Sequence, residues 1–229
     1  MILPLISHNL AMIKKMIITQ ALIYSLFAHD IWIDDALVLH YGHMHMKDSH
    51  GEEKEIKKED INKVFCSANS DIFEVQSKEL SAKCDSLFVV LNEAYYTKTP
   101  YGTKKQSKDK TKMAISSFKS IESVKRINSD DSVQIFNKGL ELSLTNKLSN
   151  IEVGDKARLL VTYDGIPKSD VSVAYADKVR GVSDKDGKIN IRIQEAGLQN
   201  IKASLTLKGD GFKCDEIIVS STLNIKVLK

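Results

Sequence analysis

The second half of the chain consists of short runs in which apolar and polar residues alternate, separated by turn-forming pairs. In the clearest run, Ile189, Ile191 and Ile193 alternate with polar residues, directly after a turn formed by Asp186 and Gly187. Successive side chains of a strand point to opposite faces of a sheet, so this alternation predicts a strand with one buried face. Similar runs cover residues 141–145, 157–163, 171–175, 188–194, 200–208 and 216–227. Strands and turns at this spacing are typical of a β-sandwich.

The first half is predicted to form another β-module. Residues 30–46 are rich in β-branched and aromatic types, and the turn-like pair Asp34 and Asp35 lies within them, which indicates two short strands. Three further runs are expected to be strands, residues 63–68, 72–75 and 86–92. The charged residues 47–60 offer almost nothing to bury, so we expect a solvated loop there.

The connection between the two halves is rich in lysine and threonine. Residues 97–112 carry this composition, and the apolar residues that follow, 113–127, recur at helical spacing and predict one short helix. The lysines could contact anionic lipid or another protein, but a run of charge is most often a solvated face. The expected organisation is mainly β, with an N-terminal β-domain over residues 29–130 and a C-terminal sandwich over residues 131–229.

The first 28 residues have the organisation of a signal peptide. Two lysines precede an apolar stretch, residues 16–27, which ends at Ala28 just before polar residues. The stretch has 12 residues, fewer than the ~20 that a spanning helix needs, which favours a cleaved signal. Leu26 is larger than the small residue expected three positions before the cut, so an uncleaved anchor is the alternative. We expect translation from Met12, cleavage after Ala28 and a periplasmic protein.

Net charge and cysteine content limit which partners, disulfides and metal sites are expected. The formal net charge is +3 with acidic and basic residues interspersed, so nucleic-acid binding is not expected. In an exported protein, Cys66 and Cys84 could form a disulfide and leave Cys214 over, whereas free buried thiols are the alternative. No CxxC spacing occurs, so a thiolate metal site is not indicated.

Histidine clustering is the strongest chemical signal in the chain, because five of the six histidines lie between residues 29 and 50. Strand geometry would place His43 and His45 on one face and His40, with two methionines, on the other. Imidazole suits nickel, copper, zinc and cobalt, and no thiolate or dense carboxylate set favours structural zinc or calcium. The cluster therefore predicts a site for a late transition metal.

Signal cleavage would make His29 a stronger ligand than an internal histidine. A chain-terminal histidine offers both its α-amine and its ring nitrogen to one ion. We predict His29, His43 and His45 as metal ligands, with His40 as a further candidate. His40 could instead face the core, and surface histidines that bind nothing are the general alternative.

Motifs of the common enzyme classes are absent from the sequence. It contains no GxSxG, no glycine-rich phosphate loop and no HExxH. We therefore expect a binding protein and not an enzyme.

Five short motifs are spread along the chain. They are Ala-His-Asp-Ile-Trp-Ile at 28–33, Tyr-Gly-His at 41–43, Tyr-Tyr-Thr-Lys-Thr-Pro-Tyr-Gly at 95–102, Asp-Gly-Ile-Pro at 164–167 and Ser-Asp-Lys-Asp-Gly-Lys-Ile at 183–189. In these motifs the chain resembles the exported proteins of domain-of-unknown-function family 4198. The resemblance implies immunoglobulin- or transthyretin-like β-modules. It also implies metal delivery, since some members are encoded with energy-coupling nickel and cobalt transporters. By the same resemblance, His29 and His43 are expected to be metal ligands.

We therefore expect a periplasmic accessory protein that captures nickel or cobalt and delivers it to the subunits of a membrane transporter. One alternative is a copper-binding protein or oxidative enzyme, in which the terminal amine, its imidazole and a second histidine form a histidine brace. A further alternative is an adhesion or scaffold module that binds protein or glycan. Ligand type does not separate the ions, because copper exceeds nickel and cobalt in affinity at almost any nitrogen site.

Overall fold

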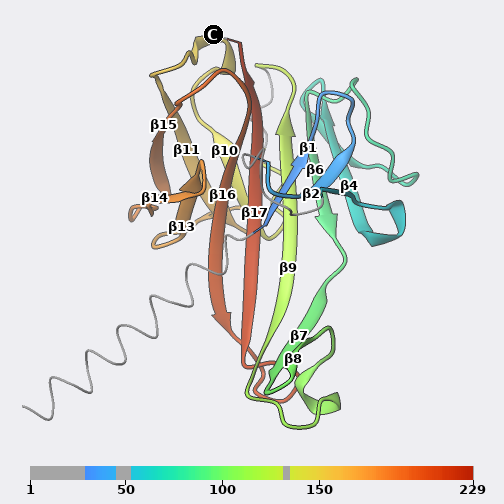
Figure 1. The fold of residues 1–229 in the computed structure, drawn as a ribbon. Coiled ribbons are helices and arrows are strands. Elements are labelled where there is room, and N and C mark those ends of the chain that lie inside the picture. Colours follow the sequence, from blue (N-terminus) through green and yellow to red (C-terminus); the bar gives the residue numbers. More distant parts are fainter. Residues whose placement is uncertain (1–28, 45–52, 131–134, 229) are drawn as a thin grey trace, which may run out of the picture.

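The computed structural model describes residues 29–44, 53–130 and 135–228, and its regular structure is almost entirely β-strand (Figure 1). The strands are β1 (Asp30–Ile33), β2 (Leu39–Gly42), β3 (Lys54–Glu55), β4 (Ile61–Ala68), β5 (Asp71–Glu74), β6 (Ser86–Leu91), β7 (Ala94–Thr99), β8 (Gly102–Lys104), β9 (Ser116–Ile127), β10 (Leu140–Leu144), β11 (Lys156–Tyr163), β12 (Ile166–Pro167), β13 (Ser172–Tyr175), β14 (Lys178–Val182), β15 (Lys188–Arg192), β16 (Gly197–Lys208) and β17 (Glu216–Val227). Single 3-10 turns occur at η1 (Lys58–Asp60), η2 (Lys108–Lys110) and η3 (Leu148–Asn150). The predicted mainly-β class is confirmed.

A ten-stranded sheet forms the middle of the molecule. Its strands follow the order β14-β13-β16-β17-β9-β6-β4-β5, and β7 joins through β9 and carries β8. The long hairpin β16–β17 is antiparallel, whereas β17 and β9 pair in parallel, from Glu216 opposite Phe118 to Asn224 opposite Arg126. Strands from both sides of the domain boundary expected after residue 130 therefore share one sheet, and that boundary stays a prediction.

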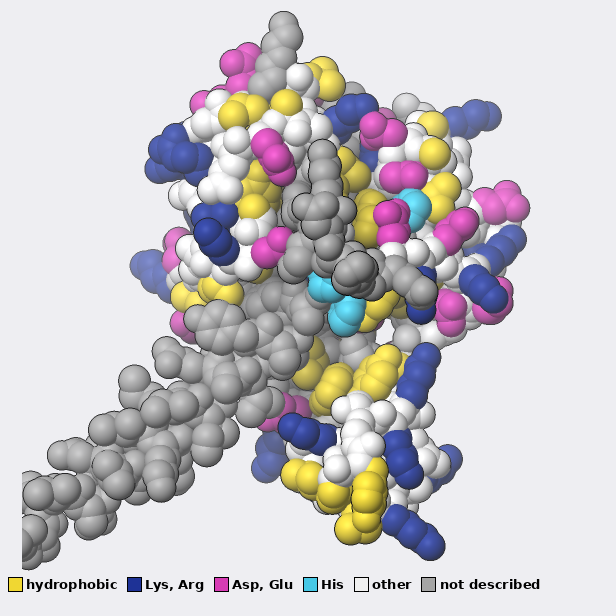
Figure 2. All heavy atoms as spheres, in the orientation of Figure 1, with side chains coloured by type: hydrophobic (Ala, Val, Ile, Leu, Met, Phe, Trp, Pro, Cys, Tyr) yellow, Lys and Arg dark blue, Asp and Glu magenta, His cyan; other side chains and the backbone are white. Residues whose placement is uncertain are grey.

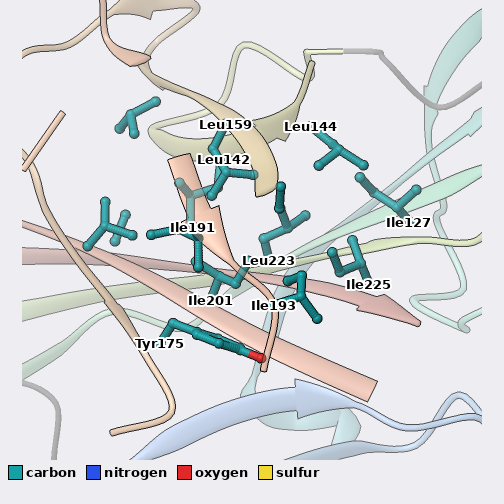
Figure 3. Packing of buried hydrophobic residues seen from close by; sticks show 14 of the residues in the cluster. Ile127, Leu142, Leu144, Leu159, Tyr175, Ile191, Ile193, Ile201, Leu223 and Ile225 are labelled. Atoms are coloured by element: carbon teal, nitrogen blue, oxygen red, sulfur yellow. The ribbon is translucent and has the colours of Figure 1, made fainter. Parts of the chain in front are cut away.

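A second sheet covers one face of the ten-stranded sheet and makes a sandwich. It contains β10, β11, β12 and β15, with β11 paired to the other three. Ile191 and Ile193 are buried in the shared core and Ile189 packs against it, so the predicted alternation is confirmed. Figure 3 shows the core side chains of both sheets meeting, among them Leu142 and Leu159 of the smaller sheet and Ile201 and Leu223 of the larger one.

The opposite face of the large sheet carries the hairpin β1–β2. Ile31, Ile33 and Leu39 of this hairpin belong to a second core cluster, which also contains Leu87 and Val124. Figure 1 shows the hairpin in blue beside β9 and β6. The two strands around the turn at Asp34, predicted from the sequence, are confirmed.

The helix predicted over residues 113–127 is wrong, because β9 occupies Ser116–Ile127. This strand lies inside the sheet, and its C-terminal part, residues 123–127, is buried on both faces. Val124 belongs to the core under the hairpin, whereas Ile121 and Ile127 pack in the sandwich core. Residues three apart in a strand point to opposite faces, so apolar residues at a spacing of three fill both cores and imitate a helical period.

Cys66 and Cys84 form a disulfide that links β4 to the segment before β6, and Cys214 is buried as a free thiol. The structure does not describe residues 1–28, which hold the expected signal peptide, its start at Met12 and the cleavage after Ala28. Periplasmic export stays a prediction. In the described ranges, no helix is long and apolar enough to cross a bilayer.

Candidate metal site

The turn of the β1–β2 hairpin is fixed by Asp34. Its backbone N–H donates to the carbonyl of Val38 at 3.0 Å, and its carboxylate accepts the N–H of Val38 at 2.8 Å. Leu37 occupies the left-handed region with φ 63° and donates its N–H to Asp34 O. A closed turn of this kind sets the register, which pairs Ile31 with Tyr41 and Asp30 with Gly42.

Polar side chains of the large sheet hold the hairpin in place. The side-chain oxygen of Asn224, on β17, accepts the N–H of Ile33 at 2.9 Å. Arg126, on β9, donates to the carbonyl of Ile33 at 2.6 Å and to the carboxylate of Asp35 at 2.8 Å. The N–H and the carbonyl of Ile33 are thereby both used, which fixes where the histidines at the open end of the hairpin lie.

His29 and His43 lie side by side at that open end. They flank the pair of Asp30 with Gly42, and their ring centroids are 5.0 Å apart with the planes tilted by 32°. The ring of His29 also stacks on Tyr41, with centroids 5.0 Å apart and planes 16° apart. The structure therefore brings together two of the predicted ligands. Figure 2 shows two adjacent cyan groups near the middle of this face.

The backbone at His29 is anchored to the sheet beneath it. The buried ammonium of Lys202, on β16, donates to the carbonyl of His29 at 2.8 Å. Burial lowers the pKa of Lys202, and the nearby carboxylates of Glu122 and Asp30 oppose that shift. Burial raises the pKa of Glu122, with Lys202 opposing. A buried ionisable group thus positions the residue that precedes β1.

The surroundings of the pair favour the neutral form of the His29 ring. Partial desolvation lowers the pKa of His29 from its usual 6.5, and the neighbouring His43 and Lys202 lower it further. Burial also raises the pKa of Tyr41 to about 12, with contributions from Glu122 and Tyr96. Neutral imidazole is the form that binds metal ions, so this environment favours binding at neutral pH.

A family model described as a domain of unknown function, DUF4198, matches residues 26–206. The chain belongs to this family. The match includes the whole hairpin and both histidines of the pair, as the resemblance predicted. No curated protein and no solved structure matches the chain significantly.

In this DUF4198 protein, His40 lies apart from the pair. Its Nε2 is 2.9 Å from a carboxylate oxygen of Asp34 and its Nδ1 is 3.0 Å from one of Glu53. The ring stacks on the buried Trp32, with centroids 5.2 Å apart. Since both ring nitrogens already have carboxylate partners, His40 is oriented away from joint coordination with the pair. Figure 2 shows a third cyan group separate from the other two and bordered by acidic side chains.

The fourth predicted ligand, His45, lies outside the described residues. Within the ranges that the structure describes, no three His, Cys, Asp or Glu side chains are grouped closely enough to hold a metal ion. The DUF4198 chain therefore presents two imidazoles together, and a complete site requires further donors.

Sequence reasoning missed Lys202, Glu122 and Tyr41 as neighbours of the pair. Tyr41 stands between two candidate histidines and could have been found from strand alternation. Lys202 is 173 residues from His29 in the sequence, and it occupies a polar position of an alternating strand that reads as solvent-facing. The contact of Lys202 with His29 follows only from the position of β16 and β17 beneath the hairpin.

A pocket of about 520 Å³ lies elsewhere, near the C-terminal end of β9 and η3. Its walls include Arg126, Asp130, Glu152 and Lys226, and none of the described histidines. It therefore has no part in the candidate metal site.

Proposed function

We propose that the protein is a periplasmic transition-metal-binding accessory protein that captures nickel or cobalt and delivers it to a membrane transporter. The observation that carries the proposal is the pair His29 and His43, whose rings lie 5.0 Å apart at the open end of an anchored hairpin. Imidazole nitrogen is a preferred donor for nickel and cobalt. Membership of the DUF4198 family supplies no activity of its own, so the proposal depends on this geometry.

The separation of the two rings is compatible with a shared ion. Bonds from imidazole nitrogen to a divalent transition metal are about 2.0–2.1 Å long, so one nitrogen of each ring can bind the same ion. Cleavage after Ala28 would add the α-amine of His29 as a third donor, and His45 would be a fourth. Lowering of the His29 pKa supports binding, because protons compete less with the metal.

An incomplete ligand set suits delivery better than permanent storage. Protein sites that keep open positions exchange ligands there, whereas closed four-ligand sites are structural. With the α-amine and two or three imidazoles, an octahedral ion would retain positions for water or for a ligand of the receiving protein. Moderate affinity and a solvent-accessible edge are the properties that hand-over requires.

Calorimetric titration with nickel chloride and cobalt chloride tests the proposal. We expect a chain that begins at His29 to bind both ions with moderate affinity, and the same chain with one residue added before His29 to bind them much more weakly. His43→Ala should also weaken binding, by about tenfold or more, through the loss of one donor. His40→Ala is the matched control, because its ring contacts Trp32 and two carboxylates instead of the pair. Equal affinity in all four chains would contradict the site.

The same donors also suit copper. An α-amine and two imidazoles form a histidine brace, and His29 and His43 are close enough to supply the rings. Peroxide-dependent oxidation of a polymer by the copper-loaded protein would favour this alternative over delivery. Normal metal uptake in cells that carry His43→Ala and His45→Ala would instead favour an adhesion or scaffold role.

A further inference from the structure

Three loops meet at the end of the ten-stranded sheet that lies away from the histidine hairpin (Figure 1). They are the turn between β7 and β8, the connection from β8 to β9, and the turn between β16 and β17. The N–H of Lys108 donates to the carbonyl of Lys213 at 2.8 Å, and the N–H of Ile115 donates to the carbonyl of Lys98 at 2.8 Å. We call this unit, residues 98–115 and 209–215, the tip.

The tip exposes large apolar side chains. Tyr101 is 84% exposed, Phe212 66%, Met113 63% and Ile115 62%, and these are four of the eleven exposed large hydrophobic residues in the described part of the chain. Tyr101 and Met113 are brought to the same end by the pairing of β7 with β9, which places Lys98 opposite Ser116. Exposed apolar residues scattered singly are ordinary, but a group at one end of a molecule marks an interaction surface.

Lysines surround these apolar side chains. Six exposed lysines belong to the tip, namely Lys98, Lys104, Lys105, Lys110, Lys112 and Lys213. None of them forms an ion pair with another described residue. Figure 2 shows the yellow and dark-blue side chains together at the lower end of the molecule.

The acidic residues of the tip are mostly occupied internally. Asp210 accepts the N–H groups of Phe212, Lys213 and Cys214 and so closes the β16–β17 turn. Asp215 pairs with Lys108 and accepts the N–H and hydroxyl of Ser117. With Asp109 as the third aspartate against seven lysines in all, the tip has a formal net charge of +4.

We propose that the tip docks the protein onto an anionic lipid surface. Apolar side chains would enter the headgroup boundary, while the lysines keep their stems along the apolar surface and their ammonium groups among the lipid phosphates. Tyrosine suits this depth because one end of its ring is apolar and the other is wet. A protein partner fits less well, since lysine is depleted at protein interfaces.

Site-specific fluorescence tests the proposal without interference from the apolar N-terminal segment. Full-length protein with Phe212→Trp is mixed with vesicles of phosphatidylcholine and phosphatidylglycerol, or of phosphatidylcholine alone, and the emission of the unsubstituted protein, which comes from its single tryptophan, Trp32, is subtracted. We expect a blue shift and quenching by brominated lipid with the anionic vesicles only, and both should weaken as salt is raised. Ile166→Trp is the matched control, because Ile166 is 70% exposed but lies outside the tip, and it should show neither change.

A charge series completes the test. In the Phe212→Trp background, Lys104→Gln, Lys105→Gln and Lys112→Gln together should raise the vesicle concentration needed for the fluorescence shift by about tenfold or more. The same number of changes at Lys57, Lys156 and Lys185, which are also exposed, should leave it unchanged. Vesicle binding without a shift at position 212 would overturn the proposal and assign binding to another segment. Tip-dependent binding only to membranes that contain protein would overturn it in favour of a protein partner.

Discussion

The two faces of β17 show how differently one sheet can use its surfaces. Val219, Leu223 and Ile225 point into the sandwich core and are almost fully buried. Thr222 and Asn224, at the positions between them, are equally buried but face the hairpin that carries His29 and His43. Apolar burial is non-directional and stabilises the fold, whereas hydrogen bonds have fixed geometry and define a position. The sandwich core therefore stabilises the fold, whereas the polar face positions the histidines.

Among the described residues, the sandwich face contains one buried ion pair, and breaking it should have the largest effect on stability. The side chains of Lys125 and Glu141 are 0% exposed, with Nζ 2.8 Å from Oε1. Burial lowers the pKa of Lys125, and Glu141 opposes the shift. Lys125→Met would leave Glu141 buried without its cation, and we expect a loss of about 3–5 kcal/mol in urea unfolding. Adding Glu141→Gln should recover most of that loss, and a double variant as unstable as the single one would contradict this account.

Truncating the apolar side of β17 should cost slightly less and should leave the candidate site in place. Leu223 is 0% exposed in the sandwich core, so we expect Leu223→Ala to lower the free energy of unfolding by about 3 kcal/mol. The NMR resonances of the His29 and His43 rings should stay where they are, because the hairpin is held from the other face. A change in those resonances as large as that of the core would show that the two faces are not independent.

Removing a polar anchor of the hairpin should instead disturb the candidate site more than the sandwich core. Asn224→Ala takes away the acceptor for the N–H of Ile33 and the donor to Asn200, and we expect a loss of about 1–3 kcal/mol. The hairpin should loosen, so hydrogen exchange at Ile33 should accelerate and nickel affinity should fall. Ser204→Ala is the control, since this buried hydroxyl finds no hydrogen-bond partner among the described residues. Faster exchange throughout the sandwich, instead of at the hairpin alone, would contradict a positioning role.

Strands that bury one face could be predicted from the sequence. Strands that bury both faces, or that are mostly polar, could not. Ile189, Ile191 and Ile193 alternate because polar positions between them face outward. Central β9 buries both faces and was mistaken for a helix. Strands β7, β8 and β14 are rich in polar and charged residues, so they resembled loops.

Only the part of the candidate site that depends on pairing between strands close in the sequence could be predicted. Clustering in the sequence brought His29, His40 and His43 to attention, and alternation correctly separated His40 from His43. The anchors of the hairpin, Lys202 and Asn224, come from strands at the far end of the chain. Contacts of this kind depend on which strands lie beneath the hairpin, and no local pattern encodes that.

The smallest expected effect is electrostatic and belongs to the hairpin alone. Desolvation, His43 and Lys202 lower the pKa of His29 below 6.5. The unfolded chain therefore binds a proton at this residue more readily than the folded chain does. Its contribution to stability is present above pH 6.5 and is lost as the pH falls toward the folded pKa.

Measurement of the His29 pKa by NMR titration would sharpen the comparison. We expect a midpoint below 6.5 in the unmodified protein and a partial return toward that value in His43→Gln, because a neighbouring positive charge is removed. His40→Gln should leave the midpoint unchanged, since His40 stacks on Trp32 and contacts Asp34 and Glu53. Leu223→Ala should also leave it unchanged, because the sandwich core lies on the other face of the sheet. A midpoint that responds equally to all three changes would mean that the fold as a whole, and not the polar face, determines the protonation of this ligand.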